Sequence, residues 1–209
     1  MLDFDGTLSL LRAGWQQVMT DQFVDALARH TATSESTVQL EAICRDFITR
    51  LTGRQTVYQT LQLEEEISKR GGEPLPALEY KKRYLDLLSD HIHYRIDAVR
   101  SDRRPTEDYL LRGSVELLRG LTAGGVTCFL ASGTDLNFVL EEAELLGLTR
   151  FFRTAGEELR IYGALEEYRK FSKKMVIERI LAEHGVEGSA LAVFGDGYVE
   201  IGGLWYVYR

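Results

Sequence analysis

The feature that most constrains this chain is a change in its apolar pattern near Pro105. After Pro105, short runs of β-forming residues, Val126–Ala131 and Ala190–Phe194, alternate with helical patterns. Strands that alternate with helices in this way indicate a parallel sheet covered by helices. The second half of the chain therefore predicts an α/β fold.

Capping residues mark the helices of this half. We predict one helix over Ser114–Leu121, ended by the Gly124-Gly125 pair, and a second from the cap Asp135 to about Leu146. Ser172 is the predicted cap of a third.

The preceding segment, residues 12–104, has a different pattern. Apolar residues recur there at helical spacing, as at Leu40, Cys44, Phe47 and Leu51, and no long window alternates with period two. We therefore predict an α/β core formed by residues 1–11 and 105–209. An all-helical domain, residues 12–104, is inserted into this core after its first strand.

Composition excludes several classes of protein. The net charge of -7 argues against a nucleic-acid binder, and no apolar run approaches the roughly 20 residues of a membrane span. Asp3 and Asp5 stand where a signal peptide would be basic, and two cysteines, Cys44 and Cys128, make no disulfide framework. We expect a cytoplasmic protein with no nucleic-acid or membrane partner.

Chemistry-bearing residues follow the predicted strands. Asp3 and Asp5 are two apart, so in a strand both carboxylates face one side, where a hard cation such as Mg²⁺ would neutralise them. The alternative is that they cap the turn at Gly6.

Three further groups lie at later strand ends or at a helix start. Ser132 follows a strand, and Asp196 and Glu200 are four apart, close enough to share an ion if the chain is helical there. The alternative is a simple turn at the glycines around Asp196. Lys173 and Lys174 open a helix, where lysines are ordinarily solvated surface residues.

The order of these motifs is more specific than any one of them. DxDGT, a strand ending in serine, a lysine and GDxxxE, in that order, resemble the haloacid dehalogenase superfamily, in its phosphatase and beta-phosphoglucomutase-like branch. The resemblance covers residues 1–11 and about 105–200, and the helical insertion resembles the helical cap of that superfamily. It implies a Rossmann-like parallel sheet.

The resemblance also implies catalytic roles. Asp3 would be the nucleophile that forms an aspartyl-phosphate, and Asp5 the general acid and base. Ser132 would hydrogen-bond the transferring phosphoryl group. The lysine that neutralises its charge is assigned to Lys174 rather than Lys173, on its spacing to the apolar face of the helix.

A cofactor follows from the same resemblance. Mg²⁺ would be held by Asp3, the carbonyl of Asp5, and Asp196, with Glu200 as a ligand or just behind one. The acid at position 5 favours phosphoryl transfer over carbon–halogen cleavage.

Four more residues are expected to bind substrate. Thr7 and Gly133 adjoin the predicted catalytic residues, and Gly53 and Arg54 resemble the specificity loop of sugar-phosphate enzymes in this superfamily. Arg54 could hold a remote phosphate or sugar hydroxyls. The alternative is a surface arginine beside a helix-breaking glycine.

The predicted function is therefore a magnesium-dependent phosphatase for a small phosphorylated metabolite, such as a sugar phosphate. The alternatives are a phosphomutase of the same fold and a noncatalytic or defective fragment. The last is motivated by termini that look clipped: only Met1 and Leu2 precede Asp3, and Glu200 is followed by a short ending whose residues Leu204–Tyr208 could form one strand. No oligomeric state is predicted.

Overall fold

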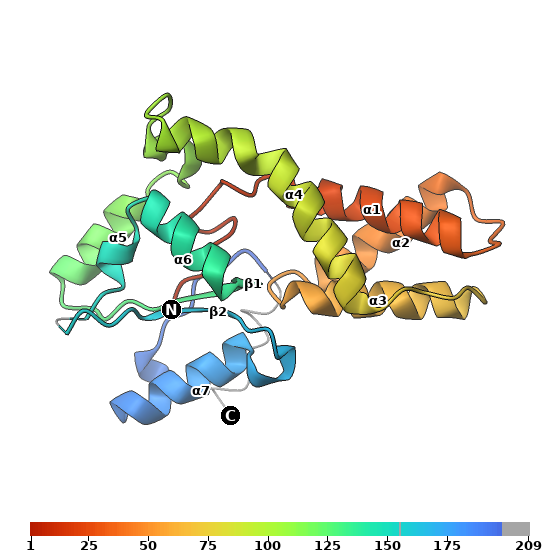
Figure 1. Ribbon diagram of the computed structural model, residues 1–209. Coiled ribbons are helices and arrows are strands. Elements are labelled where there is room, and N and C mark those ends of the chain that lie inside the picture. Colours follow the sequence, from red (N-terminus) through yellow and green to blue (C-terminus); the bar gives the residue numbers. More distant parts are fainter. Residues whose placement is uncertain (155, 198–209) are drawn as a thin grey trace. The chain divides into compact units, whose positions relative to one another are not determined.

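The computed structural model describes residues 1–154 and 156–197 (Figure 1). The chain divides into two compact units, which are described separately below. The first, the core unit, consists of Met1–Ala13, Gly53–Gln55 and Tyr94–Arg209, and the second, the helical unit, of Gly14–Thr52 and Thr56–His93.

The core unit is built on parallel pairing. Strand β1 (Leu130–Asp135) pairs in parallel with β2 (Ile161–Ala164). On the other side of β1, Leu2 forms parallel bridges to Leu130 and to Phe194. The order across the sheet is therefore Phe194, the N-terminal segment, β1 and β2, so the first residues of the chain lie in its interior. The predicted α/β fold with a parallel sheet is confirmed.

Helices accompany this sheet in the core unit. Its α-helices are α5 (Ser114–Ala123), α6 (Leu136–Leu145), α7 (Lys173–His184) and the last residues of α4 (Ala77–Arg100). Short 3₁₀ helices are η1 (Thr106–Tyr109), η2 (Thr149–Phe151), η3 (Tyr168–Lys170) and η4 (Gly188–Ala190).

Two apolar clusters show that helices cover both faces of the sheet. Leu2 and Leu130 belong to a cluster with residues of α5 and α6, whereas Met1 and Ala131 belong to a second cluster with residues of α7. Neighbouring residues of one strand thus contact opposite helical layers, as the period of two requires. In Figure 1, α5 and α6 lie on one side of β1 and β2 and α7 on the other.

The strand positions differ from the predicted runs. The predicted run Val126–Ala131 is continuous in sequence, but the strand begins at Leu130, and Val126 is 49% exposed. Pairing rather than β propensity sets this start, because Leu130 is the residue that Ile161 and Leu2 both face. In the predicted run Ala190–Phe194, Phe194 alone forms a bridge. Leu204–Tyr208 lies outside the described residues.

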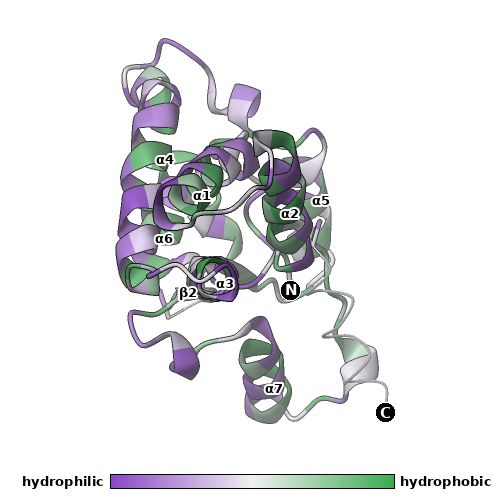
Figure 2. Cartoon of the chain, turned by 90° about the vertical axis from the view of Figure 1, so that its right-hand side faces the viewer, coloured by the Kyte–Doolittle hydropathy of each residue, from purple (hydrophilic) through white to green (hydrophobic). Residues whose placement is uncertain are grey.

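The helical unit contains α1 (Trp15–His30), α2 (Thr37–Arg50), α3 (Thr56–Lys69) and the first residues of α4. In α2, Ser36 and Gln39 form a reciprocal capping box, which satisfies amides at the start of the helix. The rings of Phe23 and Phe47 stack with centroids 5.8 Å apart between α1 and α2. In Figure 2 these helices show both hydrophobic and hydrophilic residues, as amphipathic helices do.

None of the helices in the described part of the chain combines the length and the apolar composition that a bilayer span requires.

Candidate active site

The N-terminal segment, which pairs with β1 and with Phe194 at Leu2, leads into a tight turn beside the predicted catalytic carboxylates. The carbonyl of Phe4 accepts hydrogen bonds from the amides of Leu8 and Ser9, both at 2.9 Å. Gly6, with φ +77°, allows the turn, and a Cβ at this position would overlap the Asp196 carboxylate. The glycine of DxDGT thus permits both the backbone conformation and the approach of a carboxylate from another strand end.

Asp3 is held by a buried lysine. The Nζ atom of Lys173 lies 2.8 Å from Asp3 Oδ1, and these side chains are only 4% and 6% exposed. The amide of Phe4 also donates to Oδ1, at 2.8 Å. The two buried charges stabilise each other, because an uncompensated charge in the protein interior is costly in free energy.

The lysine beside Asp3 is therefore Lys173, and the assignment to Lys174 is corrected. Val176, Ile177 and Ile180 form the buried face of α7, and Lys173 lies three, four and seven positions before them on the same face. Lys174 points elsewhere: its side chain is 53% exposed, 3.7 Å from Glu178. Met175, which follows Lys174, is 45% exposed and is not part of the buried face.

Asp5 is held through one of its two carboxylate oxygens. Oδ2 accepts hydrogen bonds from Ser132 Oγ at 3.2 Å and from Thr134 Oγ1 at 2.7 Å. Ser132 Oγ in turn accepts one from the Thr134 amide at 3.0 Å. Ser132 thus lies in the predicted site, where its hydroxyl contacts Asp5. Thr134 was not predicted, although it is two residues after Ser132 in one strand, the spacing that puts two side chains on one face.

A buried ion pair next to Asp5 was also missed. Arg12 Nε donates to both oxygens of Glu142, at 3.0 and 3.1 Å, and Nη2 donates to Oε1 at 2.7 Å. Burial raises the pKa of Glu142, and the charge of Arg12 opposes that rise. Arg12 Nε lies 3.8 Å from Asp5 Oδ1. No local pattern predicts a pair between residues so far apart in sequence.

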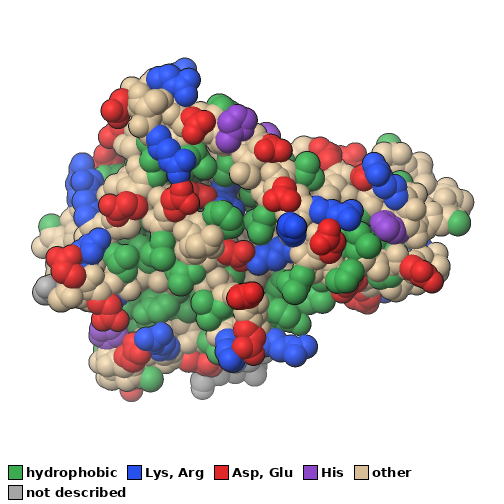
Figure 3. Space-filling view, in the orientation of Figure 1, with side chains coloured by type: hydrophobic (Ala, Val, Ile, Leu, Met, Phe, Trp, Pro, Cys, Tyr) green, Lys and Arg blue, Asp and Glu red, His purple; other side chains and the backbone are tan. Residues whose placement is uncertain are grey.

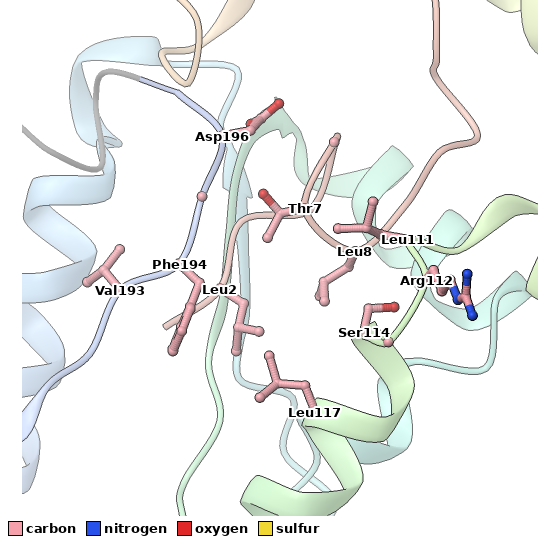
Figure 4. Close-up of a pocket in the computed structure, with 13 residues that line it drawn as sticks. Leu2, Thr7, Leu8, Leu111, Arg112, Ser114, Leu117, Val193, Phe194 and Asp196 are labelled. Atoms are coloured by element: carbon pink, nitrogen blue, oxygen red, sulfur yellow. The ribbon is translucent and has the colours of Figure 1, made fainter.

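Thr7 lies at the edge of a cavity of about 550 Å³ in the core unit (Figure 4). Its hydroxyl is buried and has no hydrogen-bond partner among the described residues. Asp196 also lines the cavity, whose remaining wall is largely apolar and includes Leu2, Leu117 and Phe194. A buried hydroxyl of this kind suits a phosphoryl oxygen, which would accept its proton.

The donors predicted for a metal are partly described. Asp196 follows Phe194, which pairs with Leu2, and its carboxylate packs against Gly6, in the turn that follows Asp3 and Asp5. Two carboxylates and the Asp5 carbonyl are hard oxygen donors, which fit Mg²⁺ by chemistry. No cluster of three or more His, Cys, Asp or Glu side chains suited to a metal occurs in residues 1–154 and 156–197. Glu200 lies outside the described residues.

The predicted specificity loop belongs to the core unit. A Cβ on Gly133 would overlap the carbonyl of Arg54, so the backbone of Gly53 and Arg54 lies directly against Gly133. Gln55, which is 3% exposed, fixes this loop: its side-chain amide donates to the carbonyls of Tyr168 and Phe171, at 2.6 and 2.7 Å. The Arg54 side chain is exposed. The loop thus adjoins Ser132 and the segment leading to Lys173.

The sequence matches the family model of haloacid dehalogenase-like hydrolases over residues 1–204. The chain belongs to this hydrolase family. The predicted resemblance is thereby confirmed. Enzymes of the family generally use a divalent metal ion. A search of curated proteins found no match.

Solved structures with the same fold come from several bacteria. A predicted phosphoglycolate phosphatase from Haemophilus somnus aligns with a TM-score of 0.60 at 14% identity, over 99% of this chain and 80% of the other. A candidate phosphatase from Clostridium difficile gives 0.55 at 17% identity, with coverages of 99% and 80%. A candidate beta-phosphoglucomutase from Thermotoga maritima gives 0.51 at 15% identity, with the same coverages. At identities of 14 to 17%, these similarities show a shared fold.

Proposed function

We propose that this protein is a magnesium-dependent phosphatase that hydrolyses a small phosphorylated metabolite through a phosphorylated Asp3. The observation that carries the proposal is the buried contact of Asp3 with Lys173, in the same turn as Asp5. A carboxylate placed next to a fixed cation can attack a phosphoryl group whose negative charge that cation offsets.

The reaction has two steps. In the first, an Asp3 oxygen forms a bond to phosphorus while the bond from phosphorus to the ester oxygen breaks, and Asp5 gives its proton to that leaving oxygen. In the second, water attacks the same phosphorus, Asp5 takes a proton from the water, and inorganic phosphate leaves as Asp3 is regenerated. Asp5 thus ends the cycle in its starting state.

Other side chains serve these steps. Lys173 would offset negative charge on the transferring group, and the Thr7 hydroxyl would donate to one of its oxygens. The Ser132 hydroxyl, which donates to Asp5 in this structure, would have to turn from Asp5 to donate to another. Asp3, the Asp5 carbonyl and Asp196 would hold Mg²⁺, with Glu200 assigned to the same group. A bound Mg²⁺ would supply further charge neutralisation of the phosphoryl group.

A phosphate-release screen over phosphorylated metabolites, with Mg²⁺ and with a chelator, tests the proposal. We expect release of inorganic phosphate that chelation abolishes and Mg²⁺ restores. Full activity in chelator would refute the metal. A folded protein that releases no phosphate from any ester in the screen would favour the noncatalytic alternative.

A phosphomutase is the second candidate, favoured by the fold shared with the candidate beta-phosphoglucomutase. A mutase would return the phosphoryl group from Asp3 to a substrate hydroxyl. The same screen separates the two, because a mutase yields an isomeric phosphate ester and little inorganic phosphate.

Arg54 is proposed to select the substrate. Its backbone is fixed against Gly133 while its side chain is exposed, so it can contact a part of the substrate remote from phosphorus. Loss of one charge-assisted hydrogen bond costs about 1.5–3 kcal/mol, or roughly ten- to a hundredfold in kcat/KM. We expect Arg54→Ala to lose that much on the best metabolite and little on p-nitrophenyl phosphate. Equal losses on both would instead place Arg54 in the catalytic machinery or in the fold.

A further inference from the structure

Arg12 and Glu142 form an ion pair inside the core unit. Neither residue has a role in the two proposed reaction steps. Their residues are 7% and 3% exposed, and three hydrogen bonds of 2.7 to 3.1 Å join them. The guanidinium also lies over the ring of Phe138, 5.2 Å from its centroid. Buried ion pairs add little net stability compared with apolar residues of similar size. The neighbouring Asp5 carboxylate, 3.8 Å from Arg12, is the group on which this pair can act.

That neighbour is Asp5, whose two oxygens differ. Oδ2 accepts two hydrogen bonds, from Ser132 and Thr134. Oδ1 is buried and accepts none within the described part of the chain. Arg12 Nε is 3.8 Å from Oδ1, near enough for attraction but beyond a hydrogen bond. The hydrogen on Nε is instead directed to both oxygens of Glu142.

We propose that Glu142 is a positioning residue that holds the Arg12 guanidinium away from Asp5, so that Asp5 Oδ1 stays open for proton transfer to and from the substrate. The inference rests on the role of Asp5 in the proposed function. Without the Glu142 charge, the nearest described anion to Arg12 is Asp5. A direct hydrogen bond from Arg12 would then occupy the Oδ1 lone pair that has to carry the proton.

The first variant is Glu142→Gln, which keeps the size of the side chain and removes its charge. General acid–base catalysis contributes about a hundredfold or more to rate, so we expect kcat to fall at least about tenfold, with KM within about twofold of wild type. A loss of stability alone would not produce such a split in molecules that remain folded. An unchanged kcat would overturn the proposal.

The second variant removes both charges. In Arg12→Met/Glu142→Leu no guanidinium remains to pair with Asp5, and apolar replacement of a buried ion pair is commonly tolerated. We expect this double variant to recover most of the kcat that Glu142→Gln loses. A double variant as slow as the single one, or slower, would show that the pair acts only as structure and would overturn the proposal.

A crystallographic comparison tests the inference without any activity. In Glu142→Gln, Arg12 should move from 3.8 Å to hydrogen-bonding distance of Asp5 Oδ1. An Arg12 that stays in place or turns to solvent would contradict the proposal. If wild type hydrolyses no ester, the proposed function fails, while this comparison still decides the position of Arg12.

If Glu142→Gln does not fold, Glu142→Asp replaces it as the test. The aspartate keeps the negative charge but is shorter by one methylene, so its carboxylate lies farther from Arg12. We expect a smaller fall in kcat, again without a change in KM. An unchanged kcat in a folded Glu142→Asp variant, together with no shift of Arg12 towards Asp5 in its crystal structure, would overturn the proposal.

Discussion

The helical unit and the candidate active site differ in how their charged side chains are paired. In the helical unit, pairs such as Arg29 with Asp25 and Arg50 with Asp46 join residues four apart, and all four side chains are more than half exposed. At the site, Lys173 and Asp3 come from opposite ends of the chain and are almost fully buried. Figure 3 shows charged side chains of both signs interspersed over the visible surface, which is the setting of the exposed pairs.

The difference teaches which charges matter to function. Exposed pairs at helical spacing are screened by solvent and contribute little to stability. A buried pair loses its hydration and adds little net stability over an apolar contact, so we expect the Asp3–Lys173 pair to matter to activity.

The largest effect is expected at Asp3. Asp3→Asn removes the nucleophile, because an amide does not attack phosphorus, and should lower kcat at least about a thousandfold. It also removes the negative charge 2.8 Å from the buried Lys173 ammonium, so a lower unfolding temperature is expected together with a folded circular dichroism spectrum. Appreciable turnover by this variant, once mass spectrometry excludes deamidation, would remove Asp3 as nucleophile.

An intermediate effect is expected at Glu35, in the helical unit. Hydrogen bonds from Arg70, one of them 2.9 Å long, are the main cause that lowers the pKa of Glu35 from near 4.5 to about 2, and a Thr33 hydroxyl adds to it. Between those values the unfolded chain binds the proton more readily than the folded one. The stabilisation is therefore complete above about pH 4.5 and is lost as pH falls toward 2.

Urea unfolding of wild type and Glu35→Gln at several pH values measures this effect. The variant should be less stable at pH 6, and the difference in unfolding free energy should shrink as the pH is lowered. A difference that is constant from pH 6 to pH 3 would show that Glu35 contributes through packing and not through its charge.

The smallest effect is expected at Arg50. Its side chain is 63% exposed and its partner Asp46 is 65% exposed. Arg50→Ala should change the unfolding free energy by less than about 0.5 kcal/mol, measured by urea unfolding. A fall in the unfolding free energy of more than about 1 kcal/mol would contradict the view that exposed pairs contribute little to stability.

Local chemistry made much of this molecule predictable. Ser172 caps α7 as predicted, with its hydroxyl accepting from the Met175 amide at 3.1 Å, because capping depends on neighbours in sequence. Asp135 occupies the cap position of α6 without a capping hydrogen bond from its side chain. The strand after Ser114–Ala123 starts later than its β-forming run, since pairing with the first residues of the chain fixes it.

The site was predictable to the same limit. Asp3 and Asp5 could be proposed as site residues because their motif is contiguous in the sequence. The lysine was misplaced by one residue because the choice depends on which face of α7 is buried, and Lys173, not Lys174, lies on that face. Arg12 and Glu142 could not be found at all, because tertiary packing brings them together across most of the chain.

The adjacent Lys173 and Lys174 offer a matched test of whether the buried pair of Asp3 and Lys173 is the centre of phosphoryl transfer. Phosphate release should be measured for Lys173→Met and for its matched control Lys174→Met, on the best substrate and with Mg²⁺. We predict that kcat falls about a hundredfold or more in Lys173→Met and stays within about twofold of wild type in Lys174→Met. Equal losses of kcat in the two variants, or a greater loss in Lys174→Met, would contradict the role of the Asp3–Lys173 pair in phosphoryl transfer.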